Sequence, residues 1–123
     1  MLMGSGKRHR VLVVEDDSRL RRAFAWALER DYDVVSVATV EEAVSRLEQD
    51  SDVALILCDL MLDGGTGVEL FDKLTALSDP RSRRFVLMTA YETARMKLPD
   101  VPMLLKPFTA VTLREKLGQL LAS

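Results

Sequence analysis

Polar side chains of complementary chemistry stand at the ends of four short apolar runs in this sequence. They are Glu15, Asp16, Asp59, Thr89 and Lys106. Carboxylates gathered at one place repel one another and raise each other's pKa unless a cation balances their charge. A hard divalent ion such as Mg²⁺, held through carboxylate oxygens and water, would supply that balance. With a lysine and a hydroxyl beside them, these groups have the composition of a site that stabilises an oxyanion or a phosphoryl group.

Asp59 is the member of this set that could carry the reaction. It ends the run VALILC at 53–58, the most apolar run of the chain, and a glycine-rich loop follows it. A carboxylate can act as a nucleophile and hold a phosphoryl group as an acyl phosphate. Taken singly, an aspartate after a strand or the dipeptide Lys106–Pro107 more often belongs to an ordinary turn. The four features together, at successive strand ends, favour phosphorylation of Asp59.

Strand-like and helix-like segments alternate along the chain and would position these side chains. Short apolar runs predict strands at 11–15, 33–38, 53–58, 85–89 and 101–105. Apolar residues at helical spacing predict helices at 18–30, around 40–47, at about 67–77 and from 109 to 121. Parallel strands need crossover helices, so the alternation predicts an α/β domain with helices on both faces of a parallel sheet. The ligand site of such a sheet lies beyond the carboxyl ends of its strands.

Local signals mark where several of these elements begin. Ser18 is a candidate N-cap of the first helix, Thr39 and Glu42 form a T-x-x-E capping box for the second, and Thr109 opens the last. Three arginines before the fourth strand are expected in a solvated loop: Arg81, Arg83 and Arg84.

The composition is that of one ordinary globular domain. The chain has 123 residues, of which 48% are apolar and 29% charged, and its net charge of −2 does not indicate nucleic acid or an anionic membrane as a partner. No apolar stretch approaches the ~20 residues of a membrane span. The single cysteine, Cys58, excludes an internal disulfide and suits a reducing cytoplasm, and one histidine, His9, makes a zinc site unexpected. Residues 1–9 lack the apolar core of a signal peptide, so we interpret them as a flexible leader or a cloning remnant, and residues 10–123 as the folded domain.

Four segments of the chain resemble, taken together, the receiver domain of two-component response regulators. They are VLVVEDDSRLRR, CDLMLDGGTGVEL, VLMTA and LLKPFTAVTLREKL. The resemblance runs from about residue 10 to residue 121 and is of the chemotaxis-regulator type. It implies a flavodoxin-like (βα)5 fold, doubly wound around a five-stranded parallel sheet of order 2-1-3-4-5. It also implies a signalling phosphoprotein rather than an enzyme, in which a sensor histidine kinase or a phosphotransfer protein phosphorylates Asp59.

The resemblance further implies a role for each site residue. The implied Mg²⁺ ligands are Glu15, Asp16, Asp59 and the backbone carbonyl of Met61. Thr89 matches the residue whose hydroxyl moves toward the phosphoryl group. Lys106 matches the lysine whose ammonium pairs with the phosphoryl group. The peptide bond between Lys106 and Pro107 is expected to be cis. Gly67 matches a glycine with an unusual backbone conformation. Asp17 is a solvated or capping neighbour.

Two surfaces are implied for partners. The outward side of the helix at 18–30 carries Arg19, Arg22 and Trp26, where the phosphoryl donor would dock, together with the site loops. An exposed tryptophan can anchor such an interface, although a half-buried tryptophan over a neighbouring helix is the alternative. An unidentified downstream protein would recognise the face formed by the fourth helix, the fifth strand and the last helix. Contact with nucleic acid or a membrane is not expected of this domain.

Three features depart from the usual pattern of the family and put the output in question rather than the chemistry. One is Asp63, which stands where a proline is frequent. Met103 occupies a position where the family has an aromatic residue that swings inward, so repacking there would be softer. Only 16 residues separate Thr89 from Lys106. Pro99 and Pro102 interrupt this stretch, so the fourth helix is expected to be short or irregular.

The sequence leaves other functions open. The domain could be a receiver-like interaction module that no longer switches, or a phosphate sink or relay, because the short helix and Met103 weaken the route to an output surface. A haloacid-dehalogenase-like phosphohydrolase also uses a strand-end aspartate, Mg²⁺ and a lysine, but its D-x-D motif would need an acid at Met61. The chain could be a stand-alone regulator or the receiver of a larger protein.

Overall fold

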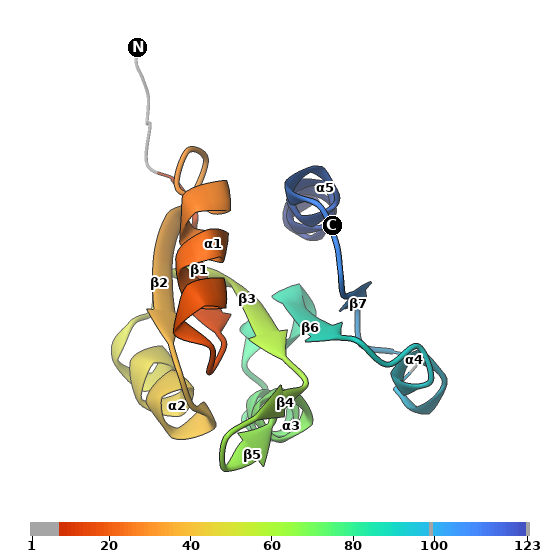
Figure 1. Ribbon diagram of the computed structural model, residues 1–123. Coiled ribbons are helices and arrows are strands. Elements are labelled where there is room, and N and C mark those ends of the chain that lie inside the picture. Colours follow the sequence, from red (N-terminus) through yellow and green to blue (C-terminus); the bar gives the residue numbers. More distant parts are fainter. Residues whose placement is uncertain (1–7, 99, 123) are drawn as a thin grey trace.

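The computed structural model describes residues 8–98 and 100–122, which form a layered α/β domain (Figure 1). Five parallel strands make the central sheet, in the order β2-β1-β3-β6-β7. Their bounds are β1 Arg10–Val14, β2 Asp33–Val37, β3 Val53–Asp59, β6 Phe85–Thr89 and β7 Met103–Leu105. Since β6 and β7 are the fourth and fifth strands of this sheet in chain order, the predicted flavodoxin-like order 2-1-3-4-5 is confirmed.

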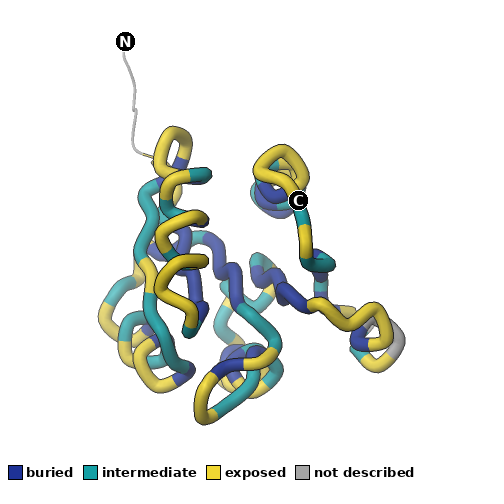
Figure 2. The backbone as a smooth tube through the Cα atoms, in the orientation of Figure 1, coloured by how far each residue is buried: buried dark blue, intermediate teal, exposed yellow. Residues whose placement is uncertain are grey.

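Helices cover both faces of the sheet because its strands are apolar on both sides. The bounds are α1 Ser18–Leu28, α2 Val40–Gln49, α3 Gly67–Ala76, α4 Ala94–Lys97 and α5 Ala110–Ala122. α1 and α5 lie on one face, and α2 and α3 on the other. Successive strand residues point to opposite faces, so Leu12 and Ile56 pack toward α2 and α3, while Val11 and Leu55 pack toward α1 and α5. The burial of β1, β3 and β6 in Figure 2 follows from this double cover, whereas the edge strand β2 is only partly buried.

Side-chain caps fix where the helices begin. Asp17, not Ser18, caps α1, since its carboxylate accepts from the N–H groups of Arg19 at 2.8 Å and Leu20 at 3.4 Å. A carboxylate at this place also interacts favourably with the positive end of the helix dipole, which a serine hydroxyl does less strongly. The capping box of α2 is confirmed, with Thr39 Oγ1 accepting from Glu42 N–H at 3.1 Å.

A small hairpin that is not among the elements predicted from the sequence follows β3. It consists of β4 Met61–Leu62 and β5 Gly65–Thr66, paired antiparallel around a two-residue turn at Asp63 and Gly64. Gly64 has a φ of +77°, which glycine adopts at little cost. The dipeptide Asp-Gly is a strong hairpin signal, so the turn could have been identified from the sequence.

Gly67 begins α3, and the reason expected for it is wrong. Among the described residues, the glycine with a positive φ is Gly64 and not Gly67. A Cβ atom at Gly67 would instead lie 2.6 Å from the carbonyl oxygen of Asp59 and 2.4 Å from a methyl group of Leu87. Glycine is therefore needed because the start of α3 approaches the end of β3 closely.

The arginines before β6 are not all in a solvated loop. Residues Pro80–Arg84 form a 3-10 helix, η1, and the Arg81 guanidinium reaches back toward α2. It pairs with Asp79 at 2.7 Å and donates to the carbonyl oxygens of Leu47 and Asp50, both at 2.9 Å. This arginine ties the amino-terminal edge of the sheet to the end of α2.

The segment between β6 and β7 contains one short helix, as predicted. α4 spans four residues, Ala94–Lys97. Pro102 follows it, whereas Pro99 lies outside the described residues. Within residues 8–98 and 100–122, no helix combines the length and the apolar character that crossing a bilayer requires.

Replacement of Gly67 by alanine is expected to destabilise the domain. The new methyl group would meet backbone, which cannot move aside as a side chain can, so we expect a loss of about 1–3 kcal/mol in the free energy of unfolding, measured with urea. Gly118→Ala is the matched control, because a Cβ at this exposed position in α5 meets nothing within 4 Å. It should gain up to about 1 kcal/mol through helix propensity. Equal stabilities of the two variants would contradict the close-approach explanation.

Candidate functional site

Three carboxylates meet at the carboxyl edge of the sheet because of the register between β1 and β3. Val14 pairs with Cys58, so the next residues along the two strands, Glu15 and Asp59, come side by side. One carboxylate oxygen from each of Glu15, Asp16 and Asp59 lies within 4.8 Å of the others. The structure thus brings the predicted acidic residues together in an arrangement that fits a divalent cation with oxygen ligands.

Lys106 approaches the carboxylates from the end of β7, the edge strand that β6 separates from β3. Its backbone N–H donates to the Thr89 carbonyl at 2.8 Å, which holds the residue at the end of β7. Its ammonium lies 3.1 Å from Glu15 Oε1 and 3.2 Å from Asp59 Oδ2. The bond from Lys106 to Pro107 is cis, as predicted. One ammonium therefore bridges the two carboxylates that end neighbouring strands.

Thr89 lies at the same edge but is not hydrogen-bonded to Asp59. It ends β6 and is buried. Its hydroxyl oxygen accepts from the Tyr91 N–H at 3.0 Å, and no hydrogen bond joins Thr89 to Asp59 in the described structure. The hydroxyl is thus engaged within its own loop.

The β4–β5 hairpin forms the rim of the site. The N–H of Asp63 donates to Asp16 Oδ2 at 3.1 Å, which links the hairpin to the loop after β1. Met61 lies in β4 with its side chain exposed, opposite Thr66. That the Met61 carbonyl is a metal ligand stays a prediction. The bond between Asp63 and Asp16 was not predicted, because it depends on the hairpin.

Burial makes the acidic cluster electrostatically unfavourable without a further cation. The Glu15 side chain is only 1% exposed. This burial, and secondarily the charge of Asp59, raise the pKa of Glu15 to about 7 against the opposing effect of Lys106. Burial alone would lower the pKa of Lys106, but the charges of Asp59 and Glu15 raise it on balance. Lys106 thus pairs with two of the three clustered carboxylates, and the excess of negative charge favours a bound cation.

The outer face of α1 carries the predicted basic and aromatic side chains. Arg19, Arg22 and Trp26 are all exposed, and Trp26 is 81% exposed. The alternative of a half-buried tryptophan over a neighbouring helix is therefore wrong. Residues three and four apart share a helix face, so Arg22 and Trp26 lie on one exposed surface.

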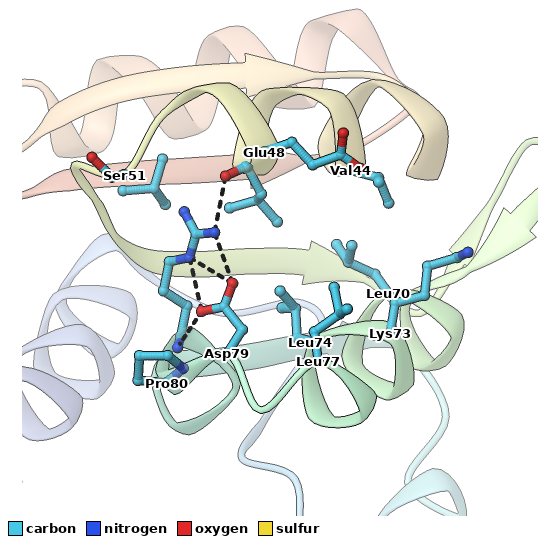
Figure 3. A pocket seen from close by; sticks show the side chains of 12 residues that line it. Val44, Glu48, Ser51, Leu70, Lys73, Leu74, Leu77, Asp79 and Pro80 are labelled. Carbon is cyan, nitrogen blue, oxygen red and sulfur yellow. Dashed lines mark hydrogen bonds and ion pairs between the residues drawn. The ribbon is translucent and has the colours of Figure 1, made fainter.

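A separate cavity of about 520 Å³ lies between α2 and α3 (Figure 3). Apolar side chains such as Leu47, Leu70 and Leu74 line it, and the pair of Asp79 and Arg81 closes one end. Val53, the first residue of β3, also lines this cavity, so the cavity lies toward the amino ends of the strands. The carboxylates lie at the opposite edge, and the cavity takes no part in their chemistry.

The sequence model of the response regulator receiver domain matches residues 11–118. The chain belongs to this family. It is a receiver domain of two-component response regulators, a class of signalling domains. The phosphohydrolase alternative is not supported.

The relatives of this receiver domain include transcriptional regulators. It is 36% identical over 70 residues to the hydrogenase transcriptional regulatory protein HoxA of Cupriavidus necator, covering 57% of this chain and 14% of that protein. It is 34% identical over 82 residues to the phosphate regulon transcriptional regulatory protein PhoB of Escherichia coli, covering 66% of this chain and 35% of PhoB. The chain therefore spans well under half of either relative.

A solved structure with the same fold is the response regulator protein TrrA from Thermotoga maritima, in complex with Mg²⁺ and BeF. The two share 26% sequence identity and superpose with a TM-score of 0.78, over 90% of this chain and 97% of TrrA.

Removal of the Glu15 carboxylate is expected to change how stability depends on pH. Its pKa is about 7 in the folded protein against 4.5 ordinarily. The stability that the Glu15 side chain contributes is therefore fully present below about pH 4.5, where it is protonated, and is lost as the pH rises to about 7. Glu15→Gln does not titrate, so in chelator-containing buffer its free energy of unfolding should gain on the wild type between about pH 5 and pH 8, on the order of 1–3 kcal/mol.

The control for this measurement is Glu48→Gln, on the exposed side of α2. It should keep the wild-type pH dependence of the free energy of unfolding. A Glu15→Gln profile parallel to that of the wild type would show that burial and Asp59 do not perturb this carboxyl.

Proposed function

We propose that Asp59 is the phospho-acceptor of this receiver domain. The observation that carries the proposal is the lysine that bridges Asp59 and Glu15 at 3.2 Å and 3.1 Å, beside three clustered carboxylates. A carboxylate oxygen of Asp59 attacks the phosphorus of a phosphohistidine on a kinase or phosphotransfer protein. The P–N bond breaks as the P–O bond forms, and the donor histidine leaves. The domain then acts in signal transmission in the cytoplasm and is not an enzyme for a separate substrate.

Glu15, Asp16 and Asp59 would hold Mg²⁺, together with the backbone carbonyl of Met61. Oxygen ligands from one or a few carboxylates are what Mg²⁺ prefers, and the related TrrA was solved with Mg²⁺ and BeF. When bound, the ion neutralises charge on the transferred phosphoryl group. Its charge would also offset the repulsion that raises the pKa of Glu15.

Lys106 and Thr89 would respond to the phosphoryl group. Lys106 already lies 3.2 Å from an Asp59 oxygen and would pair with the new oxygens. Thr89 would exchange its bond with the Tyr91 N–H for one with the phosphoryl group, so the loop after β6 would move. The motion would reach an unidentified downstream protein through the face formed by α4, β7 and α5.

The exposed face of α1 would dock the phosphoryl donor. Trp26 offers an apolar anchor, and Arg19 and Arg22 offer charge. Such a face fits a partner surface with carboxylates around an apolar hollow.

A phosphate sink or relay, or a module that no longer switches, is the second candidate. The observations in its favour are the four-residue α4 and the buried Met103, which replaces the expected aromatic residue. Both weaken the route from the site to an output face without altering the phosphorylation residues.

Beryllofluoride, a mimic of the acyl phosphate, distinguishes these functions. In the wild type with Mg²⁺ we expect amide NMR shifts near Asp59, Thr89 and Lys106 that extend through α4 and β7. Asp59→Asn should abolish them, because the mimic bonds to the carboxylate oxygen. Asp72→Asn, an exposed aspartate on α3, should respond as the wild type.

Each outcome of this measurement has a distinct meaning. Shifts confined to the site would favour the sink or relay over the switch. No shift at all, while Mg²⁺ binding is observed, would refute the phospho-acceptor assignment.

Changes on the outer face of α1 should slow transfer from a protein donor alone. In Trp26→Ala and Arg22→Ala we expect about a tenfold lower rate with the histidine kinase or phosphotransfer protein that phosphorylates the wild type fastest in a panel. Phosphorylation by acetyl phosphate, which needs no docking surface, should be unchanged. Arg83→Ala, on the exposed side of η1, serves as a control for loss of positive charge. If Arg83→Ala slows transfer equally, net charge rather than the α1 face governs docking.

A further inference from the structure

Helix α1 supports the acidic half of the site through Arg21. This half-buried arginine donates from Nη1 to the carbonyl oxygen of Glu15 at 2.7 Å. The N–H of Glu15 donates in turn to the Val37 carbonyl of β2 at 3.1 Å. The peptide groups on both sides of Glu15 are therefore held, and the one that Arg21 holds leads directly into Asp16.

The same helix supports the cationic half through an aromatic stack. The ring of Phe108 lies on that of Phe24, with centroids 5.9 Å apart and planes 12° from parallel. Phe108 is two residues after Lys106, and Phe24 is one helical turn after Arg21. Both rings belong to the apolar layer between the sheet and the helices α1 and α5. The stack thus fixes the loop that carries Lys106 against α1.

We propose that Arg21 and Phe108 are positioning residues for phosphoryl transfer, which hold the metal-binding carboxylates and Lys106 from one helix. The inference rests on the proposed function of Asp59. In the described residues no hydrogen bond or ion pair joins either residue to Asp59, so each acts through another: Arg21 through the loop of Glu15 and Asp16, and Phe108 through Lys106.

Shared support explains why two groups from distant parts of the chain keep a fixed separation. Lys106 and Glu15 lie 91 positions apart in sequence and 3.1 Å apart in space. Their side chains are long, and a displacement of about 1 Å at a reacting centre is enough to lower a rate severely. With both loops held to α1, a displacement of the helix carries the two groups together. A donor that docks on the outer face of α1 therefore contacts the element that aligns the site.

The chain offers a matched control for each residue. Arg114 resembles Arg21, since it is half-buried and donates to a backbone carbonyl, that of Ala27, at 2.9 Å, but it joins α5 to the far end of α1. Phe71 resembles Phe108, since it is half-buried and packs on another ring, that of Phe85, with centroids 5.4 Å apart, but on the opposite face of the sheet. Replacing these controls by leucine removes equivalent packing without reaching the site.

The test is the rate of phosphorylation by acetyl phosphate, measured as a function of Mg²⁺ concentration. Acetyl phosphate requires no docking surface, so the rate reports on the site. Arg21→Leu and Phe108→Leu should each be at least about tenfold slower than the wild type. Arg114→Leu and Phe71→Leu should stay within about twofold of it, although all four variants lose stability.

The Mg²⁺ dependence separates positioning from loss of structure. Arg21→Leu should raise the Mg²⁺ concentration needed for half-maximal rate, because it releases the metal-binding loop. Phe108→Leu should leave that concentration unchanged and lower the maximal rate, because it releases Lys106. Phe108→Tyr keeps an aromatic ring for the stack and should restore the wild-type rate.

Two outcomes would overturn the inference in different ways. If the wild type is phosphorylated and the four leucine variants slow in proportion to their lost stability, Arg21 and Phe108 have only a structural role. If the wild type takes no phosphoryl group from acetyl phosphate and binds no beryllofluoride, the proposed function fails and the inference falls with it.

Discussion

The repulsion between the Glu15 and Asp59 carboxylates is the interaction on which the rest of the site depends. The register of β1 against β3 forces the two residues side by side, and burial of Glu15 removes the water that would otherwise screen them. Lys106 offsets part of this repulsion by lying between them. The remaining excess of negative charge favours a bound cation at this edge of the sheet.

The strands tolerate this unfavourable cluster because packing at other places stabilises them. Each strand packs on helices at both faces, and Arg81 secures the opposite edge of the sheet to α2. A domain held by two apolar layers can tolerate a local electrostatic penalty at one edge. The apolar layers thus provide the stability of the domain, and the polar groups at the strand ends form its candidate site.

The sequence predicted the sheet and the gathering of polar residues at its carboxyl edge, because strands buried on both faces read as continuous apolar runs and polar residues mark their ends. It did not predict features that depend on distances across the fold. Gly67 is required by the proximity of Asp59 and Leu87, which no local pattern reveals. Arg81 appeared solvated because its carbonyl partners lie over thirty residues away. The exposure of Trp26 depended on whether another helix covered α1, which periodicity alone does not decide.

The exposed position of Trp26 gives this domain a built-in optical reporter. It is the only tryptophan of the chain and lies almost fully in water on the outer face of α1. Indole emission shifts to shorter wavelength when water is excluded from the ring. A protein that covers α1 would therefore change the intrinsic fluorescence of the domain, whereas a small phosphodonor that reacts at the proposed acceptor, Asp59, would leave this surface open. The emission of Trp26 would thus report docking on α1 in the unlabelled protein, separately from the chemistry at the strand ends.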